Sequence, residues 1–161
     1  MCRSQEIAEL ELDDLQFSEA GDCRVLVRRS KADPSGDGRV AWLSPDTTAR
    51  LHLWLEAAGI KKGPVFRALC TGRASHAPLD TSSIRRLVKR AGKRIAAKHR
   101  EGPLPSGHSM RVGAAQDMLV AGFDMAAIMQ AGGWKSPNVL ARYVENAATR
   151  EVHQKRWRTI G

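Results

Sequence analysis

Aromatic side chains make up only 5% of this 161-residue sequence, and Tyr143 is the only tyrosine. Cysteine is also scarce: Cys2, Cys23 and Cys70 are odd in number, widely separated and form no C-x-x-C pair. This pattern argues against a disulfide framework or a zinc site and favours reduced thiols in the cytoplasm. No run approaches the ~18 consecutive apolar residues of a membrane-spanning helix, and no signal peptide opens the chain. We therefore expect a cytoplasmic protein without a metal site or membrane association.

Acidic residues are outnumbered, 17 Asp and Glu against 26 Lys and Arg, which gives a formal net charge of +9. A surface with this imbalance attracts polyanions, and nucleic acid is the partner class it favours. The length and the 42% hydrophobic content predict one folded unit, residues 1–161, with a single core.

Hydrophobic patterning predicts the elements of the first half. A short amphipathic helix is expected at residues 4–10. Two apolar runs, 23–29 and 39–43, flank a turn-rich connector and predict a hairpin with a long tip. A helix from Pro45 to Gly59 follows, then a short third strand at 65–66.

The rest of the chain is expected to be helical, so the fold class is mainly α with a small antiparallel β-sheet. Residues 81–100 form one such helix, in which an apolar face leaves six cations on the remaining surface. These six cations could simply form a solvated face of a basic protein. Because the charges are all of one sign, contact with DNA is the favoured interpretation. The six candidate DNA-binding residues are Arg85, Arg86, Lys89, Arg90, Lys93 and Arg94.

Downstream, the sequence resembles a helix-turn-helix. Ser106 is placed to cap a helix over residues 107–121, Gly122 to end it, and Asp124 to cap the next helix. On the first of these helices, His108 and Arg111 are three residues apart and share a face.

An imidazole and a guanidinium on one face can address one phosphate together, because the arginine fork binds phosphate oxygens in pairs. The H-x-x-R spacing alone is also typical of an ordinary surface pair on a basic helix. The later run Gly132-Gly133-Trp134 and Tyr143 make the pattern more specific. A phenol, an imidazole, a guanidinium and an indole N–H donor together form a coherent set for phosphoryl transfer.

These residues resemble the catalytic domain of the tyrosine recombinases, or phage-type integrases, and most closely the Cre recombinase branch, where tryptophan stands in place of a common histidine. The resemblance rests on the runs 108–115 and 128–134, followed by Tyr143. Upstream, Arg3 and Glu6 fit the R-x-x-E of the family's first arginine, and Lys31 fits its hairpin lysine.

The resemblance implies an enzyme that cuts and rejoins DNA without a cofactor. Tyr143 would attack the scissile phosphate and form a 3′-phosphotyrosine. Arg3 and Arg111 would bind the non-bridging oxygens, and Trp134 would donate its indole N–H to the same developing charge.

Three further roles follow from the resemblance. Lys31 would protonate the leaving 5′-oxygen, His108 would act as a companion acid or base, and Glu6 would orient the cluster. Arg3 and Glu6 also fit an ordinary i, i+3 ion pair, Lys31 a turn lysine, and Trp134 and Tyr143 core or surface aromatics.

The expected partner is double-stranded DNA, which full-length relatives bind as tetramers on two duplexes. The resemblance covers a partial catalytic domain without the family's N-terminal core-binding domain, so we expect weak, salt-sensitive DNA binding and little recombination. We also expect a helix-like tail over residues 145–161 and a bacterial, nucleoid-associated or mobile-element origin. Two alternatives stay open, a non-enzymatic DNA-binding module and a type IB topoisomerase-like relaxase.

Overall fold

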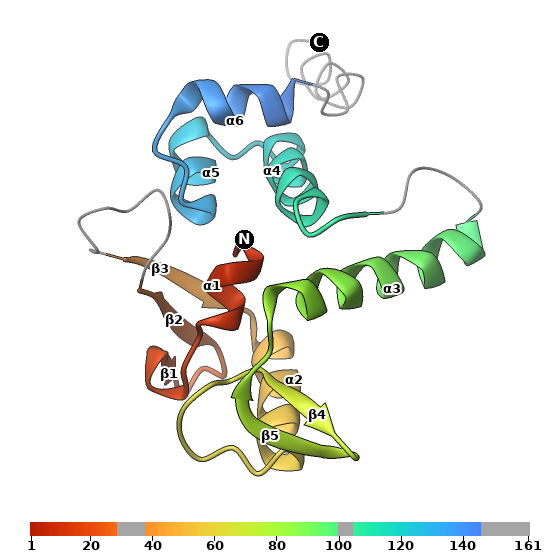
Figure 1. Cartoon of the computed structure of the whole chain (residues 1–161). Helices are drawn as coiled ribbons and strands as arrows, with labels where there is room; N and C mark the ends of the chain where they lie inside the picture. Colours follow the sequence, from red (N-terminus) through yellow and green to blue (C-terminus); the bar gives the residue numbers. More distant parts are fainter. Residues whose placement is uncertain (29–37, 100–104, 146–161) are drawn as a thin grey trace. The chain divides into compact units, whose positions relative to one another are not determined.

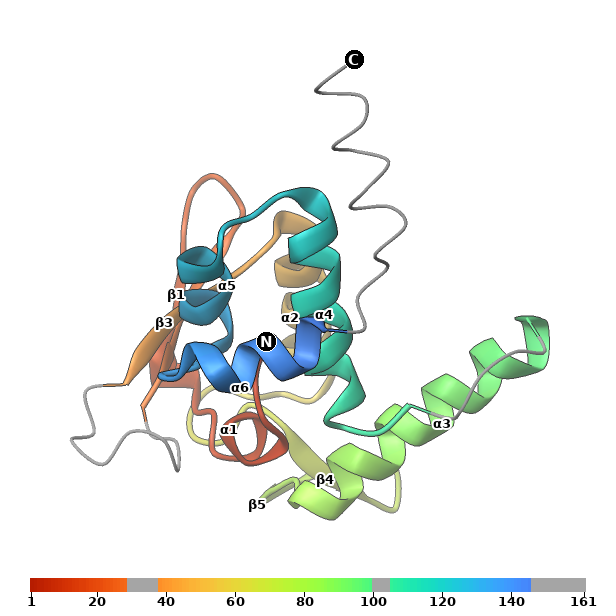
Figure 2. The same ribbon diagram turned by 90° about the horizontal axis from the view of Figure 1, so that it is seen from above.

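The computed structural model describes residues 1–28, 38–99 and 105–145 of the chain (Figures 1 and 2). Two compact units are distinguished, an N-terminal unit of residues 2–104 and a C-terminal unit of residues 105–161 together with Met1. The expectation of one catalytic domain over residues 1–161 stays a prediction.

The N-terminal unit combines helices with two small antiparallel sheets. Its elements are α1 (Ser4–Ala8), a 3₁₀ turn (Leu12–Asp14), β1 (Leu15–Phe17), β2 (Cys23–Val27), β3 (Arg39–Leu43), α2 (Pro45–Ala57), β4 (Arg67–Cys70), β5 (Arg73–Pro78) and α3 (Thr81–His99). The first helix therefore ends two residues earlier than expected.

The expected hairpin is confirmed as β2 and β3, which pair antiparallel with Val25 opposite Ala41. On β2, Cys23, Val25 and Val27 are buried while the intervening residues are partly exposed. This alternation places one face of the sheet on a core shared with Leu51 and Leu55 of α2, among others. The hairpin tip, including Lys31, lies outside the described residues.

Helix α2 also agrees with the sequence prediction. Ser44 is its N-cap and accepts a hydrogen bond from the backbone N–H of Thr47 at 3.4 Å, and Pro45 occupies the first turn. The chain leaves the helix through Gly59, whose φ of +63° suits glycine.

The strand expected at residues 65–66 is wrong. Val65 is fully buried without being part of a strand, and its carbonyl accepts the indole N–H of Trp54 at 2.8 Å. Its apolar character reflects core packing, and the strands lie downstream, where β4 and β5 form a second hairpin. The expectation that the rest is helical was therefore also wrong, and β1, a three-residue strand, was missed.

The C-terminal unit contains α4 (Ser109–Ala121), α5 (Met125–Gly132) and α6 (Pro137–Val144). Gly122 ends α4 at φ +92°, and the Asp124 carboxylate caps α5 by accepting the N–H of Ala127 at 2.7 Å, both as predicted. Helix α4 begins two residues later than expected, with His108 at the cap position, although the Ser106 hydroxyl does accept the N–H of Ser109.

The core of this unit is small and is formed by side chains of all three helices and of the turn after α5. Its buried members are Ala115, Ile128, Trp134 and Leu140. Among the described residues, no helix is both long enough and apolar enough to cross a membrane.

Candidate active site

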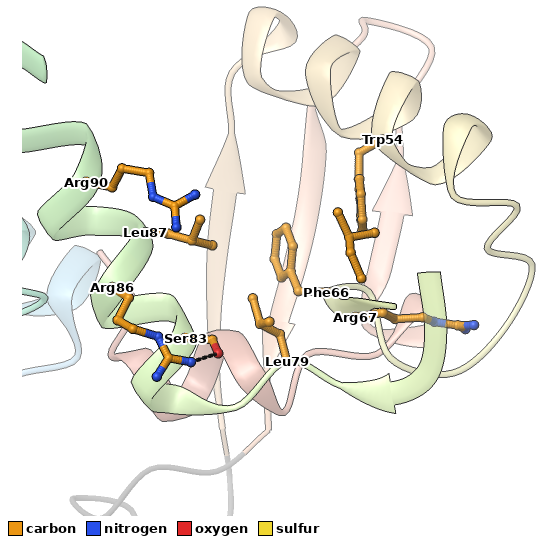
Figure 3. Close-up of a pocket in the computed structure, with 9 residues that line it drawn as sticks. Trp54, Phe66, Arg67, Leu79, Ser83, Arg86, Leu87 and Arg90 are labelled. Carbon is orange, nitrogen blue, oxygen red and sulfur yellow. Dashed lines mark hydrogen bonds between the residues drawn. The ribbon is translucent and has the colours of Figure 1, made fainter. Parts of the chain in front are cut away.

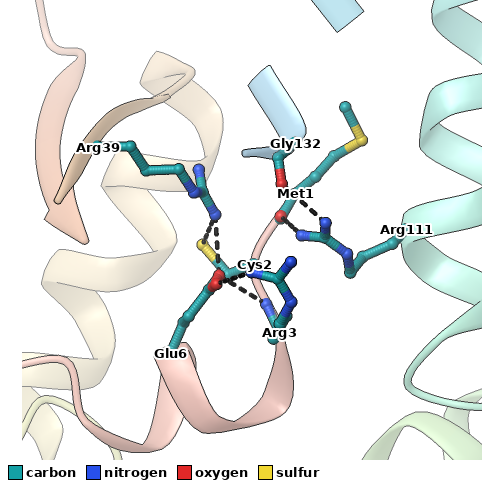
Figure 4. A network of polar contacts seen from close by, with 7 residues as sticks. All are labelled: Met1, Cys2, Arg3, Glu6, Arg39, Arg111 and Gly132. Atoms are coloured by element: carbon teal, nitrogen blue, oxygen red, sulfur yellow. Dashed lines mark hydrogen bonds and ion pairs between the residues drawn. The ribbon is translucent and has the colours of Figure 1, made fainter. Parts of the chain in front are cut away.

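Arg111 is a buried cation of the C-terminal unit. It lies in the first turn of α4, and only 4% of its surface is exposed. Its guanidinium donates to the carbonyl of Gly132 at 2.7 Å and to the carbonyl of Met1 (Figure 4). Because a buried guanidinium must have its donors satisfied, these carbonyls fix its position at the C-terminal end of α5.

Trp134 lies against this guanidinium. The Cζ of Arg111 is 4.6 Å from the centroid of the indole ring, a cation–π arrangement. Gly133 adopts the left-handed conformation, with φ 65° and ψ 41°, and ends α5 so that Trp134 turns into the core. The turn at Gly133 thus places the indole beside Arg111.

Tyr143 lies on α6, and its ring lies within reach of the rings of both His108 and Trp134. The His108 ring meets it edge-on, with centroids 4.9 Å apart, and the Trp134 ring lies 5.9 Å away. Tyr143 is half-buried and His108 is exposed. Within the C-terminal unit the structure therefore brings together all four residues selected from the sequence, His108, Arg111, Trp134 and Tyr143.

Gln116 helps to hold the Tyr143 backbone and was not predicted from the sequence. It lies on α4, and its Nε2 donates to the backbone carbonyl of Tyr143 at 2.9 Å. This bond ties the tyrosine-bearing turn of α6 to the helix that carries Arg111. A lone glutamine in a helix gives no sequence signal for such a role.

In the N-terminal unit, Arg3 and Glu6 form the expected pair. Arg3 Nη1 lies 2.6 Å from Glu6 Oε1, and the backbone N–H of Arg3 donates to Glu6 Oε2 at 2.9 Å. The Glu6 side chain is 1% exposed, against 33% for Arg3. The pair is thus built around a buried carboxylate.

Arg39 was also missed. Its Nη2 lies 2.9 Å from Glu6 Oε2, so the carboxylate has a second guanidinium partner from β3 (Figure 4). The signal was present in the sequence, because Arg39, Ala41 and Leu43 alternate onto the face that packs on the core, where a cation needs a partner.

The electrostatics at Glu6 follow from these contacts. Burial alone would raise the pKa of this carboxyl. The backbone and side-chain hydrogen bonds from Arg3, with the charge and hydrogen bond of Arg39, outweigh burial and hold the pKa below its ordinary value. Glu6 is therefore a carboxylate at neutral pH, between two cations.

Helix α3 presents its cations in two stripes. Ser83, Arg86, Leu87 and Arg90 follow the i, i+3, i+4, i+7 spacing of one face and line a cavity of about 470 Å³ (Figure 3). Trp54, Phe66, Arg67, Leu69 and Leu79 complete its lining.

Arg85, Lys89 and Lys93 recur at i, i+4, i+8 on a different stripe and are exposed. Of the apolar face expected on this helix, Ile84 is buried, while Leu87 and Ile95 are 50% and 61% exposed. Arg86 and Arg90 are exposed as well, but they also border the apolar cavity, which Arg85, Lys89 and Lys93 do not line.

The described residues contain no group of three or more His, Cys, Asp or Glu side chains that could hold a metal ion. The chemistry available in the described parts is that of a phenol, an imidazole, an indole and several guanidiniums. The amine of Lys31 is a candidate from the sequence only, because this residue lies outside the described ranges.

Comparison with known proteins gives several similarities. The chain is 30% identical over 157 residues to the recombinase Cre of Escherichia phage P1, covering 91% of this chain and 46% of that protein. It is 27% identical over 150 residues to the XerD homologue, an integrase/recombinase, of Selenomonas ruminantium, covering 89% and 43%. The chain thus spans a little under half the length of these relatives.

Solved structures show the same fold. The XerA recombinase superposes with a TM-score of 0.75 at 22% identity, covering 96% of this chain and 53% of that one. The XerH site-specific recombinase, in a post-cleavage complex with its difH substrate, gives 0.67 at 18% identity, covering 97% and 42%. The helical fold with small antiparallel sheets expected from the sequence is confirmed.

The sequence pattern of the phage integrase family matches residues 1–150 of this chain. This range is nearly the whole chain and includes all seven residues proposed for catalysis. The resemblance drawn from the sequence is confirmed: the chain belongs to the phage integrase family.

Proposed function

We propose that this chain is the catalytic domain of a site-specific DNA recombinase or integrase, a strand transferase that cleaves and rejoins double-stranded DNA through a 3′-phosphotyrosine. One observation carries the proposal: the rings of His108 and Trp134 lie against that of Tyr143, and the Arg111 guanidinium lies over the same Trp134 indole. A phenol beside an imidazole and a fixed guanidinium is suited to attack a phosphodiester.

In this scheme Tyr143 is the nucleophile. Its oxygen bonds to the scissile phosphorus, the bond to the 5′-oxygen breaks, and the phenolic proton passes to a base, for which His108 is the nearest ring. Arg111 and Arg3 bind the non-bridging oxygens, and Trp134 donates to the same charge. Lys31 returns a proton to the leaving 5′-oxygen, and Glu6 holds Arg3.

The phosphotyrosine conserves the energy of the phosphodiester, so attack by a different 5′-hydroxyl rejoins the strand without a nucleotide cofactor. The exposed cations of α3, with the net charge of +9, supply the affinity for the duplex. Assembly as a tetramer on two duplexes, a cytoplasmic location and an origin in a bacterial mobile element belong to this proposal.

The second candidate is a DNA-binding module without chemistry, which the charged stripe of α3 alone would support. The two functions are separated by a nicked suicide duplex, from which the 5′-hydroxyl fragment diffuses away after cleavage and traps the intermediate. Because the target site is unknown, the substrate is a pool of duplexes with randomised half-sites.

The expected result is a covalent protein–DNA adduct on a denaturing gel that disappears with Tyr143→Phe. The phenylalanine variant should still bind DNA in a mobility-shift assay, because the lost hydroxyl contributes to chemistry and little to affinity. Binding by the unsubstituted chain without any adduct would instead establish the DNA-binding module.

A further inference from the structure

Glu6 gathers three donors around one buried carboxylate. Oε1 accepts Arg3 Nη1 at 2.6 Å, and Oε2 accepts both the Arg3 backbone N–H and Arg39 Nη2 at 2.9 Å. The carboxylate side chain is 1% exposed. Two guanidiniums with one carboxylate leave this cluster with a net charge of +1.

Arg39 reaches Glu6 from the first residue of β3. It pairs across the hairpin with buried Val27, and its side chain is 15% exposed. Nη2 of Arg39 also lies 3.5 Å from the Cys2 thiol (Figure 4). The side chain therefore joins the start of β3 to the segment that carries Arg3.

The backbone before Arg39 is equally constrained. Gly38 has φ +71°, and a Cβ at this position would lie 2.9 Å from the Val27 carbonyl oxygen. The backbone that leads into Arg39 at the start of β3 thus requires glycine.

Sharing the carboxylate has a consequence for Arg3. A buried carboxylate with a single guanidinium would neutralise that guanidinium and turn its donors inward. With Arg39 on Oε2, part of the Glu6 charge is compensated from β3, and Arg3, at 33% side-chain exposure, keeps N–H donors for an anion.

We propose that Arg39 is a positioning residue for the strand-transfer reaction: through Glu6 it holds Arg3 ready for the phosphate. This inference rests on the proposed function. Arg39 touches neither the substrate nor the reacting atoms in this assignment.

The test compares Arg39→Met, which keeps the aliphatic bulk and removes the charge, with Arg39→Lys, which restores a cation. Arg50→Met is the matched control, since Arg50 forms an exposed pair with Asp46 in which both side chains are 77% exposed. Each variant is assayed for single-turnover adduct formation at saturating duplex, for duplex affinity, and for folding by circular dichroism at the assay temperature.

Arg39→Met is expected to slow adduct formation by roughly 10- to 100-fold, the scale of a misplaced catalytic group. Its affinity for the duplex should change far less. Arg39→Lys should recover most of the rate, because an ammonium reaches the same carboxylate, and Arg50→Met should match the unsubstituted chain. In a Glu6→Gln background, Arg39→Met should slow the reaction little further, since both act through one contact.

Two results overturn the assignment while leaving the proposed function intact: Arg39→Met reacting at the unsubstituted rate, or a rate loss that follows loss of folding and is not recovered by lysine. Independent, multiplicative effects of the Glu6 and Arg39 substitutions would also overturn it. If the unsubstituted chain gives no Tyr143-dependent adduct, the proposed function and this assignment fail together.

Discussion

His108 meets the ring of Tyr143 edge-on, with centroids 4.9 Å apart and ring planes at 68°. The two residues come from different elements, the cap position of α4 and the last turn of α6. His108 is exposed and Tyr143 is half-buried, so the imidazole is open to solvent while it lies next to the phenol. This contact makes His108 the residue to test as the base in the proposed reaction.

The first prediction is that His108→Gln slows formation of the Tyr143 adduct by roughly 10²- to 10⁴-fold, the usual range for loss of a general acid or base. Single-turnover cleavage of the suicide duplex measures it. His52→Gln is the control, because His52 is also exposed and stacked on an aromatic ring, that of Phe17 at 4.2 Å, and has no proposed role. Equal rates for the two variants would remove His108 from the mechanism.

The second prediction concerns Gly132, the buried last residue of α5. A Cβ built there would overlap the Cζ3 and Cε3 atoms of Trp134. Gly132→Ala should therefore displace the indole from Arg111 and destabilise the C-terminal unit by about 1–3 kcal/mol, the usual cost of overpacking a core.

Gly113→Ala is the matched comparison, because a Cβ at Gly113 meets no heavy atom within 4 Å in the middle of α4. It should stabilise the chain by about 0.5–1 kcal/mol through the lower helix cost of alanine. Urea unfolding followed by tryptophan fluorescence measures both. If the two alanine variants unfold at the same urea concentration, a Cβ at Gly132 does not disturb Trp134 and the prediction is wrong.

Several features were accessible from the sequence because they depend on local chemistry. Apolar runs predicted β2 and β3, Pro45 predicted the start of α2, and Gly122, predicted to end α4, takes the left-handed conformation there. The motif residues of α4 to α6 are close along the chain, so short helices were sufficient to bring them together.

Other features depend on tertiary contacts that local patterns do not encode. Val65 looked like a strand residue, but its carbonyl is taken by the Trp54 indole and the residue fills the core. The six cations of α3 looked equivalent until Arg86 and Arg90 were found to line a cavity whose walls come from α2 and the β4–β5 hairpin. Gln116 bonds to a residue 27 positions away, which spacing cannot reveal, and although the strand pattern shows that Arg39 needs a partner, it does not identify Glu6, 33 positions away.

The third prediction concerns pH. The folded state lowers the pKa of Glu6 below the ordinary 4.5, so the unfolded chain binds the proton more tightly. The stabilisation from this carboxylate is therefore fully present above about pH 4.5 and is lost as pH falls through the lower folded value.

Glu6→Gln should consequently cost about 1–3 kcal/mol of unfolding free energy at pH 7, the range for leaving buried hydrogen-bond partners unmatched. The difference from the unsubstituted chain should shrink as the pH is lowered below 4.5. Urea unfolding at pH 7 and in the acid range measures it, with Asp46→Asn in the exposed pair as the control. A stability difference that is the same at every pH would show that the Glu6 charge plays no part.

The fourth prediction separates the two stripes of α3. Arg85, Arg86, Lys89 and Arg90 are all exposed, but only Arg86 and Arg90 border the apolar cavity, where Arg86 also donates to the Ser83 hydroxyl at 2.6 Å. Phosphate contact releases counterions, and each lost contact lowers the slope of log affinity against log salt by about 0.9. Arg85→Gln with Lys89→Gln should therefore reduce the slope by about 1.8, and the Arg86→Gln, Arg90→Gln pair by much less. Because both double variants remove the same charge from the chain, equal slopes would mean that only net charge matters and that α3 has no preferred DNA-binding stripe.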